Sequence, residues 1–519
     1  MVTSENITEQ WAVSKAAVHS RGGLVATNHF DASEIGAEVL RAGGNAVDAA
    51  VAVSFAIGIV EPWNSGLGGC GFVQVFDASS GKVTSLDFGT VAPRGVNPDD
   101  YPLTGGTSDD GFGWPEVIDD RNFIGPYSAG VPTLVSGMAT LLKEFGTRNW
   151  RESLEPAVSL AERGMWVDWY ATLIIAYEAA IIARYPNLAE VYLPGGYPPA
   201  AGWDGGMPLL NLAALAATLK RLSVAGPEDF YSGEIAAKID SDARRAGCPL
   251  RREDLADFRT TVCAPSTGQY RGATIHSAPG LSAGPTLLDA LRLLETHDLG
   301  PTPDAASYLA VADSLFQAYE TRLATMGEVS QAQSSTTNFS VIDGDGNMVV
   351  VTQTLMSTFG SMVRLPETGV ILNNGMLWFD PVPGRINSIA PGKRPLSNMA
   401  PTVIVRGDKP DFALGASGGR RIFPALFQLI SFIHDFDMNL NDAFEQPRIE
   451  VSGGPGVTVD PRLGDGIVDA IAAKHPIVVE QSGVRPTSFA TPNAVMRDKS
   501  GDHSAVAHIA TPWPKVAAA

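Results

Sequence analysis

Residues 335–354 show the clearest alternation of side chains in the chain. Two β-rich runs in this stretch alternate with a period of two, and Asp345-Gly346 stands between them. An Asp-Gly pair between two alternating runs is a strong signal for a tight hairpin turn. The pattern therefore predicts two antiparallel strands and places Thr336 at the beginning of the first.

Apolar residues with helical spacing flank this hairpin on both sides. Residues 34–60 are predicted to form two helices, of which the second has Asn45 and Asp48 as capping residues and an apolar body at 49–60. That body is shorter than the ~20 residues that cross a bilayer, so it indicates a buried helix. Further expected helices span residues 134–145, 153–163, 209–222, 305–326 and 421–433.

Shorter apolar runs and stretches rich in glycine or proline complete the pattern. We expect strands at residues 71–76, 370–373, 402–406 and 411–415, and loops at 103–114 and 192–208. Residues 327–335 are small and polar, which favours an exposed segment that bends back before the hairpin. Strands on both sides of Thr336 with helices around them indicate an α+β fold.

Composition and charge narrow the classes of function. The chain has 519 residues, of which 45% are hydrophobic, so it can bury a large core. Length alone suggests about two to four domains. The chain carries 37 basic and 56 acidic residues, a net charge of −19, and phosphate-bearing partners would be repelled. We therefore expect neither nucleic acid nor a membrane surface as a partner.

Signals for targeting and for cofactors are absent from the sequence pattern. Residues 1–20 lack the apolar core of about 7 to 15 residues that a secretion signal needs, so a cytoplasmic location is expected. The three cysteines, Cys70, Cys248 and Cys263, show no paired spacing, and the chain has no His-x-x-x-His motif. The sequence therefore predicts no disulfide scaffold, no metal site and no cofactor.

Thr336 is the residue with the most distinctive potential chemistry. A threonine hydroxyl needs an adjacent base to act as a nucleophile at neutral pH. If the bond between Ser335 and Thr336 were cut, the new α-amino group, with a pKa of roughly 7.7 to 8, would be that base on the same residue. Adjacent threonines such as Thr336 and Thr337 are also ordinary β-branched strand residues, so the pair alone leaves both interpretations open.

Motifs elsewhere favour the catalytic interpretation, because together they resemble the γ-glutamyltransferase family over residues 21–464. They occur in the family's order: Gly43-Gly44-Asn45-Ala46-Val47-Asp48-Ala49-Ala50, Val60-Glu61-Pro62, Ser65-Gly66-Leu67-Gly68-Gly69-Cys70-Gly71-Phe72, Gly130-Val131-Pro132, Thr336-Thr337, Leu372-Asn373-Asn374, Lys393-Arg394-Pro395-Leu396-Ser397 and Gly415-Ala416-Ser417-Gly418-Gly419. The resemblance implies a four-layer αββα sandwich of the N-terminal nucleophile hydrolase type. It also implies self-cleavage into a large subunit, residues 1–335, and a small subunit, residues 336–519, which stay intertwined as a heterodimer; a higher oligomer is left open.

The resemblance assigns catalytic roles residue by residue. Thr336 matches the nucleophile, whose freed amine is the base, and Thr354 matches the threonine that hydrogen-bonds it. Gly418 and Gly419 match the adjacent glycines whose backbone N–H groups hold the developing oxyanion. The chain is therefore expected to be a threonine hydrolase or acyltransferase that passes through an acyl-enzyme on Thr336.

Several substrate contacts of the family are replaced in this chain. Ser397 matches one of two substrate-contacting serines, whereas Asn398 stands in place of the other. Gly89 occupies the position of the arginine that clamps the glutamyl α-carboxylate, and Trp378 that of the aspartate that meets the amino group. Met356 replaces an asparagine. We therefore expect a more apolar site that acts on an amide or related acyl compound without a free α-amino acid head, and not on glutathione.

Other interpretations remain open from sequence. One is a genuine γ-glutamyl hydrolase or transpeptidase, a second is a relative that breaks a C–C bond next to a carbonyl, and a third is a ligand-binding protein without activity. A fourth is a serine α/β-hydrolase, because residues 415–419 match the Gly-x-Ser-x-Gly elbow with Ser417 as the nucleophile. Its histidine would be one of the four that follow, His434, His475, His503 or His508.

Overall fold

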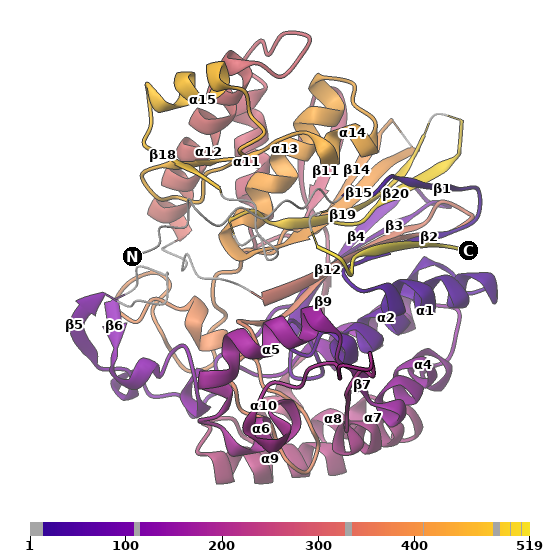
Figure 1. Cartoon of the computed structure of the whole chain (residues 1–519), viewed down its shortest axis with the longest axis vertical. Coiled ribbons are helices and arrows are strands. Elements are labelled where there is room, and N and C mark those ends of the chain that lie inside the picture. The colour runs from indigo at the N-terminus through magenta and orange to yellow at the C-terminus, as the bar shows by residue number, and fades with distance from the viewer. Residues whose placement is uncertain are drawn as a thin grey trace.

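Two seven-stranded antiparallel sheets lie face to face in the computed structural model (Figure 1). The structure describes residues 14–107, 115–326, 335–407, 409–480, 488–498, 500–509 and 511–519. The sheet with the predicted hairpin, called the hairpin sheet, has the order β21 (Lys515–Ala518), β2 (Leu24–Thr27), β12 (Ser335–Ile342), β13 (Met348–Met356), β3 (Cys70–Asp77), β4 (Lys82–Phe88) and β9 (Thr261–Cys263). The facing sheet has the order β1 (Val18–Ser20), β20 (His503–Val506), β19 (Thr491–Arg497), β15 (Lys409–Ser417), β14 (Thr402–Arg406), β11 (Ala273–Ser277) and β10 (Ser266–Tyr270).

Helices cover the outer face of each sheet (Figure 1). The helices on the hairpin sheet are α1 (Phe30–Arg41), α2 (Ala46–Val60) and α3 (Leu134–Phe145). Those on the facing sheet are α11 (Gly284–Leu294) and α13 (Ile422–Asp435), with α12 (Ala305–Met326) packed on α11. One apolar core lies under each helical layer and a third lies between the sheets. The mixed α+β class is therefore confirmed.

Further helices extend both helical layers. Beyond α2 and α3 lie α4 (Trp150–Arg163), α5 (Trp169–Ile182), α6 (Pro186–Tyr192), α7 (Ala213–Ala225), α8 (Glu228–Tyr231), α9 (Glu234–Ala246) and α10 (Arg252–Asp257). Beside α12 and α13 lie α14 (Leu440–Glu445) and α15 (Asp465–Ala472), with a small sheet of β16 (Ile449–Glu450), β17 (Val457–Val459) and β18 (Ile477–Val479). The remaining strands pair as β5 (Leu103–Thr107) with β6 (Pro115–Val117) and β7 (Met165–Trp166) with β8 (Leu209–Leu210).

The cap predicted for the second helix is present. The Asn45 side chain accepts hydrogen bonds of 2.9 Å from the backbone N–H groups of Val47 and Asp48. The Asp48 carboxylate accepts one of 2.9 Å from Asn45 N–H, so the two side chains form a capping box. All residues of α2 are buried, as expected of a helix that is apolar all round.

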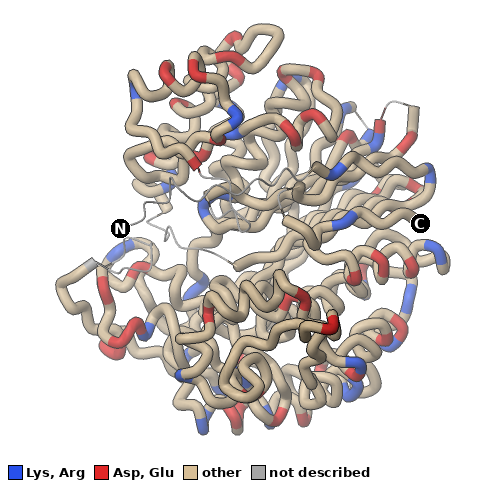
Figure 2. The backbone as a smooth tube through the Cα atoms, in the orientation of Figure 1, with Lys and Arg blue, Asp and Glu red and all other residues tan. Residues whose placement is uncertain are grey.

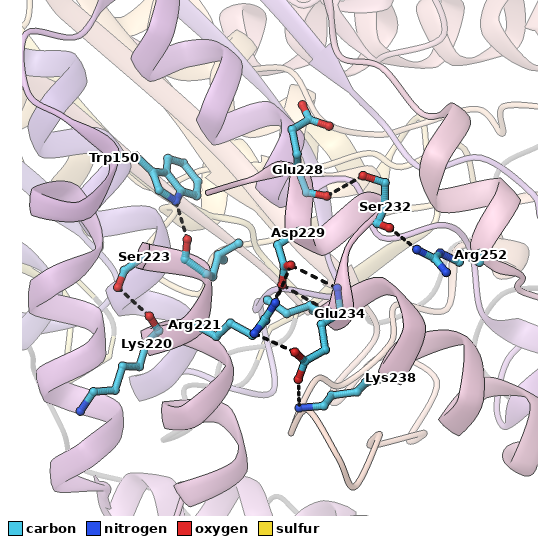
Figure 3. A network of polar contacts seen from close by, with 12 residues as sticks. Trp150, Lys220, Arg221, Ser223, Glu228, Asp229, Ser232, Glu234, Lys238 and Arg252 are labelled. Atoms are coloured by element: carbon cyan, nitrogen blue, oxygen red, sulfur yellow. Dashed lines mark hydrogen bonds and ion pairs between the residues drawn. The ribbon is translucent and has the colours of Figure 1, made fainter. Parts of the chain in front are cut away.

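A polar network holds the outer helical layer together (Figure 3). Arg221 on α7 donates two hydrogen bonds, of 2.7 and 2.9 Å, to Asp229, and Asp229 also accepts from the backbone N–H of Glu234 at 3.1 Å. The carboxylate thus joins α7 to the first turn of α9. Figure 2 shows charged residues mostly on the helical layers and loops around the sheets.

Most of the predicted elements are present, and four predictions differ from the structure in whole or in part. Residues 370–373 form no strand, because the backbone N–H groups of Leu372 and Asn373 donate to loop carbonyl oxygens and Ile371 makes only an isolated bridge. Residues 103–107, predicted as loop, form β5, whereas 108–114 lie outside the described residues. The predicted helix at 209–222 begins only at Ala213, after β8. Of the segment 327–335, predicted to be exposed, only Ser335 is described, and it is 8% exposed and paired with Met356 in the ladder.

Candidate active site

The hairpin of β12 and β13 places the two candidate threonines opposite each other. The register pairs Thr336 with Thr354, and it shifts by a bulge between Ser335 and Thr336. Alternation along β12 directs Phe339 toward the helices and Ile342 into the core between the sheets. By the same alternation Thr336, an even-numbered residue like Ile342, lies on the face that meets the other sheet.

The Thr354 hydroxyl contacts both groups at the predicted cut. It accepts a hydrogen bond from the Thr336 hydroxyl at 3.1 Å and donates one to the carbonyl oxygen of Ser335 at 2.6 Å. The backbone N–H of Met356 donates to the same hydroxyl oxygen at 2.7 Å. A hydroxyl has one proton and two acceptor positions, so all three are occupied. Because a carbonyl oxygen can only accept, the Thr354 proton must point to Ser335, and Thr336 must be a donor.

The double glycine lies where β15 ends and α13 begins. Gly418 has φ +138° and Gly419 has φ +63°, conformations that favour glycine. A Cβ on Gly418 would lie 2.9 Å from the Cα of Ala490, so the turn also needs the absence of a side chain. Further back along β15, a Cβ on Gly415 would lie 2.1 Å from the side-chain nitrogen of Asn338 on β12. The strand that leads to the double glycine therefore packs directly on the strand of Thr336.

Helix α12 holds two loops of the site side by side. The Tyr319 hydroxyl donates to the carbonyl oxygen of Arg420, immediately after the double glycine. Three residues further along the helix, Arg322 donates to the carbonyl oxygen of Ser397 at 2.7 Å. Arg322 is 2% exposed, and burial lowers the pKa of its guanidinium to about 10, so it remains charged at neutral pH.

The residues that replace the family's polar contacts gather in one apolar cluster. Met356 and Trp378 are buried in it together with Phe72 and Met399. A Cβ on Gly89 would lie 3.1 Å from the Asp87 carboxylate and 3.4 Å from the ring of Phe72, which places Gly89 at the edge of the same cluster. Met356 and Trp378 therefore have apolar surroundings, whereas Gly89 also borders the carboxylate of Asp87.

Ser397 and Asn398 precede Met399 of this cluster and are both buried. The Ser397 hydroxyl accepts from the backbone N–H of Met399 at 3.2 Å. The Asn398 side chain is 3% exposed and forms no hydrogen bond with any residue that the structure describes. Both residues border the apolar cluster through Met399, so they are candidate contacts for a bound ligand.

The basic residues before this loop have partners within the protein. Lys393 donates to the carbonyl oxygens of Ile386 and Ser388 at 2.7 and 3.0 Å, and Arg394 pairs with Asp87 at 2.7 Å. Both side chains therefore stabilise the loop.

The interpretation as a serine α/β-hydrolase is wrong. That fold requires a largely parallel sheet, whereas β15 pairs antiparallel with both β14 and β19. The Ser417 hydroxyl is bonded to Thr491, and within the described ranges no histidine hydrogen-bonds it.

Sequence reasoning missed a buried carboxylic acid beside the hairpin. The hydroxyl of Thr337 donates to Glu61 at 3.0 Å, and burial raises the pKa of Glu61 to about 7. The motif Val60-Glu61-Pro62 was the available signal, but a contact over 276 positions cannot be found by spacing. Among the described residues, no His, Cys, Asp and Glu side chains cluster as metal ligands, and no helix is long and apolar enough to cross a membrane.

Comparisons with known proteins agree with this geometry. The model of the family described as Gamma-glutamyltranspeptidase matches residues 32–334 and 326–512. The acylase ACY 1 proenzyme of Pseudomonas sp. (strain V22) is 35% identical, over 89% of this chain and 88% of its own. The glutathione hydrolase proenzyme of Bacillus subtilis (strain 168) is 29% identical, over 92% of this chain and 88% of its own.

Solved structures share the fold. The cephalosporin acylase from Bacillus halodurans superimposes with a TM-score of 0.86, at 24% identity, over 99% of this chain and 98% of that one. The γ-glutamyltranspeptidase of Helicobacter pylori matches with a TM-score of 0.51 and 29% identity, over 62% of this chain and 86% of that one. With its two sheets, its threonine hairpin and a family model that matches most of its length, this chain belongs to the γ-glutamyltranspeptidase family of proenzyme hydrolases.

Proposed function

We propose that the chain is a self-processing threonine amidohydrolase that cuts itself between Ser335 and Thr336 and then uses Thr336 as the nucleophile. The observation that carries the proposal is the position of the Thr354 hydroxyl, 3.1 Å from the Thr336 hydroxyl and 2.6 Å from the Ser335 carbonyl oxygen. A hydrogen bond to that oxygen polarises the carbonyl that must be attacked. Relatives named as proenzymes support the same process.

Processing follows from this arrangement as an acyl shift from nitrogen to oxygen. The Thr336 hydroxyl oxygen attacks the carbonyl carbon of Ser335, and the C–N bond between the two residues breaks. The proton lost by the hydroxyl passes to the departing nitrogen. Water then hydrolyses the ester, which leaves a carboxylate on Ser335 and a free amine on Thr336. The amine, with a pKa of roughly 7.7 to 8, is the base for later turnovers.

Turnover of a substrate repeats the same chemistry on another carbonyl. The amine takes the proton of the Thr336 hydroxyl as its oxygen attacks the substrate amide, and the substrate's amine leaves with a proton. The N–H groups of Gly418 and Gly419 would hold the oxyanion, a contribution of about 2.7 to 4 kcal/mol per donor in other enzymes. Water or an amine acceptor then releases the acyl group.

The two pieces would remain together as intertwined subunits of an αββα sandwich. Residues 1–335 supply β2, β3 and β4 to the hairpin sheet, and residues 336–519 supply the rest of β12 with β13 and β21. In the facing sheet, β11 from the first piece pairs with β14 from the second. Separation would expose strand edges in both sheets.

For the substrate, we propose an acyl amide without an α-amino acid head. Met356 and Trp378 lie in an apolar cluster with Gly89 at its edge, so a glutamyl group would lack the charged contacts that the family supplies at these three positions. The charged side chains beside Gly89, Asp87 and Arg394, are paired with each other. Asn398 offers a buried amide for a neutral carbonyl or hydroxyl. Relatives named acylase are consistent with this class.

A γ-glutamyl compound is the second candidate, because other relatives are named glutathione hydrolase. The decisive experiment compares γ-glutamyl-p-nitroanilide with p-nitroanilides of simple acyl groups, using protein whose cleavage has been established by intact mass. Fragments of residues 1–335 and 336–519 with faster turnover of simple acyl groups are expected. Active protein that contains only the uncut chain would refute the nucleophile, and a preference for the glutamyl compound would refute the substrate class.

A further inference from the structure

A chain of buried hydrogen bonds runs from the facing sheet to Glu61, which is the C-cap of α2. Its links are His508 N–H to Asn493 Oδ1 at 3.1 Å, Asn493 Nδ2 to Asn28 Oδ1 at 2.8 Å, Asn28 Nδ2 to Thr337 Oγ1 at 3.4 Å, and Thr337 Oγ1 to Glu61 Oε2 at 3.0 Å. The five residues are between 0 and 7% exposed. The chain therefore reaches Glu61 through Thr337, the residue that follows the proposed nucleophile.

The direction of every proton in this chain follows from its backbone end. A backbone N–H can only donate, so Asn493 must present its oxygen to His508 and its nitrogen to Asn28. Asn493 also donates to the carbonyl oxygen of Asn338 at 2.8 Å, which can only accept. Asn28 must then receive on its oxygen and donate from its nitrogen to Thr337. The Thr337 hydroxyl accepts this bond and donates its own proton to Glu61.

The turn that contains Glu61 also holds the second strand of the hairpin. The backbone N–H of Leu355 donates to the carbonyl oxygen of Asn64 at 2.9 Å. Thr337 and Leu355 are the residues directly after Thr336 and Thr354, so one turn binds the neighbour of each threonine. Glu61 and Asn64 belong to the first piece of the chain, and both threonines belong to the second.

The location of Glu61 suits a neutral carboxyl group. It lies at the C-terminal end of α2, where the helix dipole disfavours an anion. No charged side chain in the described part of the chain contributes to its pKa, which burial raises to about 7 and hydrogen bonds from Thr337 and Asn64 oppose. A buried carboxyl group lowers the stability of the fold. Its presence here is explained if its position serves another purpose.

We propose that Glu61 and Thr337 form a positioning pair that fixes the direction of the Thr336 side chain and of its amine after cleavage. The inference rests on the proposed function. Once cut, Thr336 becomes a chain end, and chain ends fray unless they are tied down. The hydrogen bond between Thr337 and Glu61 holds the strand one residue from its end, on the face opposite to the reaction, and does not involve the Thr336 hydroxyl or amine.

The test compares Thr337→Val with Thr337→Ser. The valine keeps the shape and loses the hydroxyl, so we expect kcat per cleaved molecule to fall about 10- to 100-fold with KM within about twofold, as small misplacements of a reacting group cause. The serine keeps the hydroxyl and should restore kcat to within about threefold. Glu61→Met should resemble the valine variant, and Glu61→Gln, which retains an acceptor oxygen, should resemble the serine variant.

A matched control removes another buried, hydrogen-bonded hydroxyl from the same sheet. Ser85 on β4 donates to Gln74 at 2.8 Å, both are fully buried, and Ser85→Ala should leave kcat unchanged. If Thr337→Val folds with the melting temperature of the control but does not cleave, the loss of cleavage supports the same positioning role. Wild-type kcat in Thr337→Val, a serine variant as poor as the valine variant, or a loss confined to KM would overturn the proposal.

Failure of this inference can be told from failure of the proposed function. If Thr336→Ala is inactive and Thr337→Val has normal activity, only the positioning pair is refuted, and Thr336 remains the proposed nucleophile. If Thr336→Ala is active, the assignment of Thr336 as the nucleophile is refuted, and the positioning pair is refuted with it.

Discussion

Thr354 donates a hydrogen bond of 2.6 Å to the carbonyl oxygen of Ser335 while it accepts one from the hydroxyl of Thr336. One hydroxyl therefore contacts the electrophile and the nucleophile of the proposed self-cleavage. After the bond is cut, the Ser335 carboxylate can leave, and the Thr354 proton becomes available to other acceptors. The same residue can thus serve processing first and turnover afterwards.

Removal of this hydroxyl should slow self-cleavage. In Thr354→Val, the Ser335 carbonyl loses its donor, and we expect cleavage to slow by about 10² to 10³, the usual effect of one oxyanion donor. A time course of intact mass on freshly purified precursor measures the rate. Thr354→Ser, which keeps the hydroxyl, should cleave within an order of magnitude of wild type, and a valine variant that cleaves as fast as wild type would contradict the assignment.

A side chain at the double glycine should damage both stability and activity. Gly418→Ala would hold a non-glycine residue at φ +138° with its Cβ 2.9 Å from the Cα of Ala490. We expect a cost of about 1 to 3 kcal/mol in the free energy of unfolding and a lower kcat. Gly464→Ala is the matched control, because Gly464 has φ −66° and a Cβ there would meet no atom within 4 Å. Equal melting temperatures for the two variants would count against the strain.

Charged groups returned to the apolar cluster should shift the substrate preference. In Gly89→Arg combined with Trp378→Asp, a guanidinium and a carboxylate are available for the head of a glutamyl group. We expect kcat/KM for γ-glutamyl-p-nitroanilide to rise at least about tenfold relative to simple acyl anilides, since each charged contact is worth more than ~1.4 kcal/mol. Gly89→Ala, which adds only a methyl group, should leave the ratio unchanged. A fall in the ratio for the double variant would show that these positions do not face the substrate.

Glu61 should make the protein less stable as the pH rises. Burial raises its pKa from 4.5 to about 7, so the folded state binds this proton more tightly than the unfolded state. The stabilisation from this proton is fully present below pH 4.5 and is lost as the pH rises from 4.5 to 7. Above pH 7 the free energy of unfolding is lower by about 3 kcal/mol. Urea unfolding of wild type and Glu61→Gln across this range should show a stability difference that grows in favour of the variant. The exposed Glu38→Gln is the control, and a difference independent of pH would contradict the shift.

The sequence was sufficient to predict the elements whose periodicity is local. The hairpin follows from two alternating runs around Asp345-Gly346, and its register brings Thr336 opposite Thr354 as the resemblance required. The capped helix α2 follows from Asn45 and an unbroken apolar run. These elements depend on neighbours within a few turns of the chain.

Features that depend on distant partners could not be predicted in this way. Residues 370–373 are apolar enough for a strand, but the Asn373 side chain bonds to loop carbonyls such as Gly68 O at 2.8 Å, and no ladder forms. Arg322 and Glu61 look like solvated surface residues in the sequence, and only the folded chain shows that both are buried against the site. Burial of a charged residue is set by packing between elements, which spacing does not record.

The order of strands in the hairpin sheet has a consequence for the timing of self-cleavage. β2, formed by residues 24–27, lies between β12 and the strand β21, formed by residues 515–518. On a ribosome that adds about 5 to 20 residues per second, Thr336 is made on the order of tens of seconds before β21. The edge strand β21 of the hairpin sheet is therefore missing when Thr336 has just been synthesised. A cut at Thr336 that needs the complete hairpin sheet would therefore wait until β21 has docked on β2.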